Sequence, residues 1–193
     1  MLVASFLFVS SASGQAEPNR SGDANFEVIL HVLVGTTKSD VGDPLPAGLS
    51  NVARQLRSDF GVQNTRVLQT FLGRLGNGGS LDYKGVSGTF AQDPIPGSPS
   101  FLEWRLMDLR KAASDGGAAI YQLQAIYFGG RVPVGAGSSN EAGKSSGAIN
   151  YEMVGLSLQR LVVAEATPTL IGTLGQPNST STIYLVLTVR NVE

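Results

Sequence analysis

The sequence predicts an α+β protein that is mostly β, with an antiparallel sheet or sandwich of about eight strands and one amphipathic helix. Most of its apolar segments alternate with a period of two, the period of a strand, whereas one segment has the period of a helix. Short stretches rich in Gly, Pro, Ser and Asn separate these segments at regular spacing, as in antiparallel β proteins. With 193 residues, the chain is long enough to bury a core without covalent staples.

Residues 25–90 read, in order, as strand, helix, strand and strand. The run NFEVILHVLVGT alternates and is rich in β-branched residues, which predicts a strand. In AGLSNVARQLRSDFG the apolar residues share one helical stripe, and Gly61 is well placed to end the helix. The stripe consists of Leu49, Val52, Ala53, Leu56 and Phe60. TRVLQTFLGRL and LDYKGVSGTF flank the turn GNGGS, which predicts a hairpin and a βαββ-like module.

Residues 101–193 read as an antiparallel β module. AIYQLQAIYFGGRVPV and INYEMVGLSLQRLVVAEA predict strands, the second with a kink at Gly155, and GAGSSNEAGKSSG between them predicts a loop. FLEWRLMDLRKA could be a strand or a helix, but its alternation favours a strand. TPTLIGTLG and STIYLVLTVRNVE predict the last two of the about eight strands. Because the final strand is apolar on nearly both faces, we expect it to be central or covered by a partner.

The N-terminus predicts export. The short apolar run LVASFLFV is followed by the small residues Ala12, Gly14 and Ala16, so we expect residues 1–16 to be a cleaved signal peptide and residues 17–24 a flexible lead-in. No Lys or Arg precedes the apolar run, and an ordinary buried strand is the alternative interpretation. The run is too short to cross a bilayer, so no integral membrane span is expected.

The composition excludes several classes of function. With 14 Lys and Arg against 15 Asp and Glu the net charge is -1, which argues against nucleic acid as a partner because phosphate binding needs a basic stripe. The absence of Cys excludes disulfides, thiolate nucleophiles and Cys-ligated metal centres. Only 15% of the residues are charged and 24 are Gly, a composition typical of exported β proteins.

No set of residues predicts catalysis, so no catalytic, cofactor-binding or metal-binding residue is assigned. His31, the single His, lies inside a strand, and no G-x-S-x-G motif accompanies it. Asp40 with Asp43, and Asp108 with Asp115, could pair as in glycosidases, but their polar surroundings favour solvated turn residues. A calcium site at Asp40 and Asp43 would lack the D-x-D-x-D-G pattern.

Aromatic residues of the predicted strands offer one possible binding face. They could stack on a sugar, although strand aromatics more often form core contacts or cross-strand pairs. The residues are Trp104, Tyr121, Tyr127, Phe128 and Tyr151.

Two segments resemble known proteins. The region from FEVILHVLVGT to LDYKGV, with LPAGLSNVARQL, a strand that ends in an Arg and a Gly-rich turn, resembles small uncharacterised exported proteins of acidobacteria-like bacteria. The tail TPTLIGTLGQPNSTSTIYLVLTVRNV is similar to the end of the secretin core of outer-membrane secretion channels. It departs from that pattern at Thr173, where a second Gly is usual, and at Val189-Arg190, where Pro-Arg is usual. These resemblances imply an envelope interaction or assembly protein.

The sequence therefore predicts a non-enzymatic, exported cell-envelope protein, periplasmic or on the cell surface. We expect a structural or assembly subunit that acts through protein-protein contacts or self-assembly at β-strand edges, without a cofactor. A subunit of an extracellular filament and a carbohydrate-binding module are the alternatives.

Overall fold

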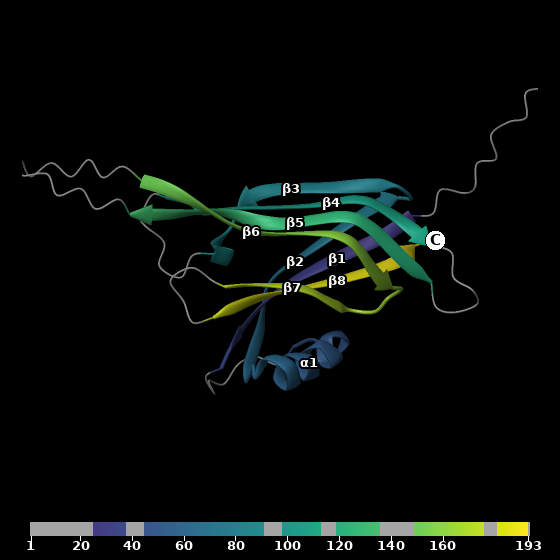
Figure 1. Ribbon diagram of the computed structural model, residues 1–193, viewed down its shortest axis with the longest axis horizontal. Helices are drawn as coiled ribbons and strands as arrows, with labels where there is room; N and C mark the ends of the chain where they lie inside the picture. The colour runs from purple at the N-terminus through teal and green to yellow at the C-terminus, as the bar shows by residue number, and fades with distance from the viewer. Residues whose placement is uncertain are drawn as a thin grey trace, which may run out of the picture.

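The computed structural model describes residues 25–37, 45–90, 98–112, 119–135, 149–175 and 181–192, and shows a β-sandwich with one α-helix on the outside (Figure 1). Two four-stranded antiparallel sheets face each other, which confirms the predicted mostly β fold. The sheet called A has the strand order β2-β1-β8-β7, and the sheet called B has the order β3-β4-β5-β6.

The bounds of the elements follow the predicted segments closely. They are β1 (Asn25–Thr36), a 3-10 turn η1 (Ala47–Leu49), α1 (Ser50–Phe60), β2 (Asn64–Gly76), β3 (Gly79–Val86), a second 3-10 turn η2 (Gly88–Phe90), β4 (Phe101–Ala112), β5 (Ile120–Gly135), β6 (Ile149–Ala164), β7 (Thr169–Gly175) and β8 (Thr182–Val192). The segment FLEWRLMDLRKA is thus a strand, as its alternation favours, and α1 ends at Gly61 with a left-handed φ of 64°.

The predicted hairpin of β2 and β3 is wrong. Each strand lies in a different sheet, since β2 pairs with β1 and β3 pairs with β4. The turn at Asn77 and Gly78, with φ of 75° at Gly78, carries the chain from one sheet to the other. Each strand then turns its apolar side chains toward the core between the two sheets. In a hairpin, the two strands would instead lie side by side in one sheet. Both sheets consequently contain strands from residues 25–90 and from residues 101–192.

The final strand β8 is central, as its apolar pattern predicts. On its inner face Ile183, Leu185, Leu187 and Val189 join the core between the sheets. On its outer face Tyr184 and Val186 form a second cluster with Leu33 of β1 and the buried stripe of α1. The helix of the same chain therefore covers the second apolar face of β8 at this end of sheet A.

Sheet B bends sharply along one row of residues. Asp108 in β4 and Arg160 in β6 have positive φ values of 52° and 56°, and the inward-facing apolar positions change from even to odd numbers in β4 at this row. The strands curve down toward sheet A at one end (Figure 1). Around the predicted kink at Gly155, by contrast, the pairing of β6 with β5 is regular. The bend thus coincides with residues of positive φ rather than with a glycine, and the register of β4, β5 and β6 is the same on both sides of it.

Candidate interaction surface

Strand β6 is an unpaired edge in the part of the chain that the structure describes. It pairs with β5 on one side and is the last strand of sheet B on the other. At 16 residues it is twice as long as β3, the opposite edge with 8 residues, and it contains no Pro or Lys. Proteins usually protect such edges with Lys, Pro or short strands, because free N–H and C=O groups invite another strand. The backbone of this edge is irregular only at Arg160, which has a positive φ.

Exposed apolar side chains form a row across the outer face of sheet B, from β6 to the opposite edge strand β3. We call them the β6 patch. It consists of Val86 (66% exposed), Phe101 (41%), Ile149 (43%), Tyr151 (40%) and Met153 (61%). Cross-strand pairing brings them together, because Val86 lies opposite Phe101, which lies opposite Arg131 and then Met153. The ring centroids of Phe101 and Tyr151 are 5.9 Å apart, so the two side chains are in contact across β5.

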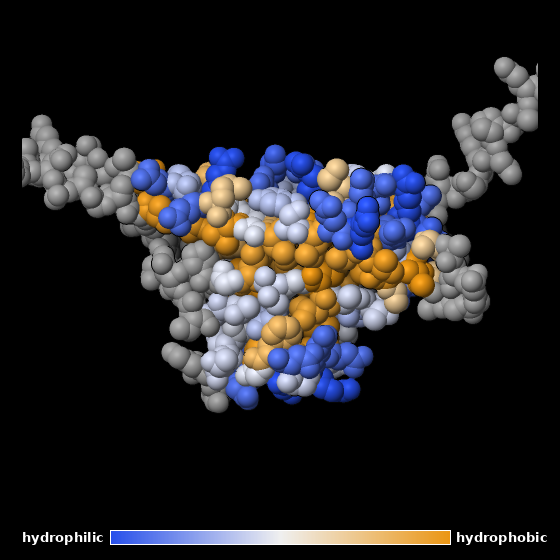
Figure 2. All heavy atoms as spheres, viewed as in Figure 1, coloured by the Kyte–Doolittle hydropathy of each residue, from blue (hydrophilic) through white to orange (hydrophobic). Residues whose placement is uncertain are grey.

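The start of β6 also lies beyond the second layer of the sandwich. Strands β5 and β6 run further to the left than the strands of sheet A, so their ends project beyond the second layer (Figure 1). In the same view an apolar band follows the seam between the two sheets (Figure 2). Partly buried side chains of β6 and β7 lie along this side of the core, among them Val154, Leu156 and Ile171. Apolar surface of this kind marks protein interaction sites on soluble proteins.

Arg131 supplies an uncompensated charge within the β6 patch. Its side chain is exposed and has no ion-pair partner among the described residues, whereas the neighbouring Lys84 lies 3.9 Å from Glu103. A hollow of about 250 Å³ between these strands is lined by Phe101, Glu103 and Arg131 among others. Burial, followed by the nearby Glu103 carboxylate, raises the pKa of Tyr127. The surface is mainly apolar, with one free cation at its centre.

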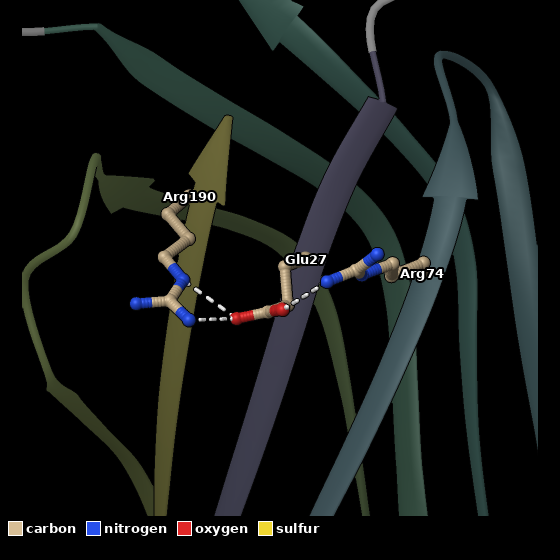
Figure 3. Close-up of polar contacts among 3 residues, drawn as sticks. All are labelled: Glu27, Arg74 and Arg190. Atoms are coloured by element: carbon tan, nitrogen blue, oxygen red, sulfur yellow. Dashed lines mark hydrogen bonds and ion pairs between the residues drawn. The ribbon is translucent and has the colours of Figure 1, made fainter. Parts of the chain in front are cut away.

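The most buried charge in the described residues has a different place and role. Glu27 of β1 is 3% exposed and lies between Arg74 of β2 and Arg190 of β8, on the outer face of sheet A (Figure 3). Arg190 donates from Nε to Oε1 at 2.6 Å and also contacts it through Nη2, whereas Arg74 donates from Nη2 to Oε2 at 3.3 Å. The three residues tie three neighbouring strands together at one row. We assign this cluster to the register of sheet A.

Polar residues considered from the sequence do not converge on one site. His31 is half-buried on the outer face of sheet A, where its Nδ1 lies 2.9 Å from Thr70 Oγ1, and burial lowers the pKa of its imidazole. Asp108 sits at the bend of sheet B and accepts from Arg110 Nε at 2.6 Å. Asp40, Asp43 and Asp115 lie outside the described residues.

The five aromatic residues considered as a sugar face are divided between the two sides of sheet B. Trp104, Tyr121 and Phe128 are buried between the sheets, and only Tyr127 and Tyr151 point outward. Alternation along the strands separates them, because successive side chains of a strand point to opposite faces. The structure instead brings Tyr151 to Phe101, a pairing that no single strand reveals.

The β6 patch was not predicted from the sequence, although the order of polar and apolar residues in β6 contains a sign of it. Ile149, Tyr151 and Met153 occupy odd positions of β6, whereas its partly buried positions Leu156 and Leu158 are even. The apolar residues thus change from odd to even positions between Met153 and Val154, so the start of β6 carries its apolar side chains on the outer face of the sheet. In β8 the helix provides the cover, but among the described elements nothing covers β6.

Within the described residues, no group of three or more His, Asp or Glu side chains is placed to hold a metal ion. None of the described helices is both long and apolar enough to cross a membrane. Compared with known proteins, the chain matches no family model and no curated protein.

Proposed function

We propose that this protein is a non-enzymatic, exported subunit of a cell-envelope assembly that acts through protein-protein contacts at the β6 patch. One observation carries the proposal: a 16-residue edge strand lacks a second neighbour among the described elements, and the outer face of its sheet has five exposed apolar side chains, three of them from this strand. Edge strands bind extended segments through their backbone, and alternate side chains supply the specificity. The apolar N-terminal run and the resemblance of the tail to the secretin core support the export and envelope parts of the proposal.

The chemistry of the surface supports binding rather than turnover. Its exposed groups are apolar or aromatic, and its single free cation, Arg131, suits a carboxylate at the rim of an interface. Two neighbouring charge pairs on this face are already engaged, as Lys84 faces Glu103 and Arg105 binds Asp82 at 2.9 Å. Apolar cores with polar rims are the usual anatomy of protein interfaces.

Photo-crosslinking in the cells that produce the protein tests the proposal. A benzophenone side chain placed at position 153 should form covalent adducts with protein, whereas the same group at Arg57, an exposed residue of α1, should not. Adducts at both positions in equal yield, or at neither, would refute the role of the β6 patch. N-terminal sequencing of the native protein tests export, since a chain that starts at Gln15 or Glu17 is expected and a start at Met1 contradicts cleavage.

A further inference from the structure

We propose that the occupant of the β6 edge is a second copy of this chain. Two β6 strands would pair antiparallel about a two-fold axis at Tyr151, so that the two sheets B form one continuous sheet. The inference rests on the proposed function and names its partner. Three independent features support it: the direction of the backbone groups, the side-chain pattern and the net charge.

The backbone groups of the projecting half of β6 point to the free edge. Pro133 of β5, which lies opposite Tyr151, has no N–H, so this pair is of the kind that exchanges no hydrogen bonds. Gly129 and Gly155, two pairs further along, agree with this, because a Cβ on Gly129 would lie 2.9 Å from the Gly155 Cα, the close approach of non-hydrogen-bonded pairs. In an antiparallel ladder such residues direct their N–H and C=O away from the partner strand. Tyr151 therefore offers both groups to a strand outside the sheet.

The side chains at the start of β6 complement their own copy. With Tyr151 on the axis, Tyr151 faces Tyr151, Ile149 faces Met153, and Asn150 faces Glu152. Each row then joins like with like or an amide donor with a carboxylate acceptor, which are favourable cross-strand pairs. The three exposed apolar residues at the start of the strand, Ile149, Tyr151 and Met153, gain lateral contacts with their copies on the outer face at the same time.

Two alternative registers are less favourable. An axis at Glu152 places two carboxylates opposite each other, which destabilises the pair. An axis at Leu156 would align Glu152 with Arg160, but it also places Tyr151 opposite Leu161. Because the positive φ at Arg160 marks the row where the inward positions of β6 change from even to odd, Tyr151 points outward and Leu161 points to the core. This register therefore matches an exposed face with a buried one.

The net charge of -1 lets two copies approach with little repulsion. A two-fold pairing of identical edges uses the same surface on both copies, so the assembly closes as a dimer and does not grow into a filament. The dimer would retain its outer face, including Arg131, for further contacts.

The chain contains no Cys, so single cysteines report the pairing directly. Light scattering of the purified protein should give twice the chain mass, and Tyr151→Cys should form a disulfide-linked dimer, because facing Cα atoms would be about 5.5 Å apart. Ser157→Cys is the control, since its two copies would lie roughly 40 Å apart. Because Tyr151→Cys also removes a ring from the interface, a mixture of Ile149→Cys and Met153→Cys provides a second test, in which cross-links between the two variants should exceed those within each.

A monomer at the highest soluble concentration overturns this inference, as does equal cross-linking at positions 151 and 157. Met153→Lys should convert the dimer to a monomer and leave the thermal stability of the sandwich intact. If the purified protein is a monomer but position 153 cross-links to a different protein in cells, the dimer is refuted and the proposed function stands. If neither a dimer nor any adduct forms, both fail.

Discussion

Replacing Glu27 by Gln provides a quantitative test of how sheet A is held in register. The substitution keeps the shape of a side chain that is 3% exposed and removes the charge that Arg74 and Arg190 share. Breaking a fully buried ion pair costs about 3–5 kcal/mol, and a hydrogen bond to a charged group contributes about 1.5–3 kcal/mol.

The exposure of the two arginines decides how large the loss of stability in Glu27→Gln should be within this range. Their side chains are 66% and 53% exposed, so each guanidinium can regain water once the carboxylate is gone. We therefore expect a loss of about 2 kcal/mol in the free energy of unfolding, with a fall in Tm of roughly 4–8 °C for a chain of this size. Arg190, which has two contacts to Oε1, should couple to Glu27 more strongly than Arg74, which has one contact at 3.3 Å.

Urea unfolding followed by circular dichroism measures the free energy, and a double-mutant cycle with Arg190→Met and Arg74→Met measures the two couplings. Glu152→Gln on the exposed start of β6 is the matched control and should change the free energy of unfolding by less than about 0.5 kcal/mol. A Glu27→Gln protein as stable as the control would refute the assignment of this cluster to sheet stability. A stronger coupling to Arg74 than to Arg190 would refute the geometric reasoning.

Two further predictions concern the core. Gly130→Ala should destabilise the protein by about 2–3 kcal/mol, because the new Cβ would overlap the Phe101 carbonyl oxygen and lie 2.6 Å from the Phe90 ring. Gly76→Ala is the control and should be nearly neutral in the same unfolding assay, because the space around its Cβ is open. Burial, followed by the hydrogen bond to Glu165, raises the pKa of Tyr121 to about 12, so its contribution to the free energy of unfolding is constant below pH 10 and is lost as the pH rises toward 12. Absorbance titration should show this late ionisation disappear in Tyr121→Phe, and an unchanged titration curve would contradict the assignment.

Much of the fold could be predicted because its signals are local. Alternation identifies the strands, and the stripe ending at Phe60 identifies α1, because the period of burial follows directly from the geometry of each element. The pairing of β2 with β1 rather than β3 could not be read in this way. A tight turn such as Asn77-Gly78 is compatible with a hairpin and with a crossing between sheets, and only the competition for buried area decides between them.

The bend of sheet B shows the same division. The change in parity within β4, from Leu106 to Leu109, is present in the sequence, yet a Gly such as Gly155 is the more familiar sign of a bend. The bend becomes visible only when β4, β5 and β6 are side by side, because their irregular positions then fall in one row. Neighbouring strands must bend together if their ladder is to continue.

The sequence by itself determined the class of the protein, the positions of its strands and helix and the two-faced character of β8, since each depends on the order of polar and apolar residues along a short segment. Only the tertiary structure decided which apolar faces are covered. It placed α1 over Tyr184 and Val186, and it left Ile149, Tyr151 and Met153 exposed on a strand that no other described strand pairs with at its outer edge. The physical reason is that burial depends on contacts between segments far apart in the chain, so an apolar strand face can become part of a core in one place and an exposed surface in another.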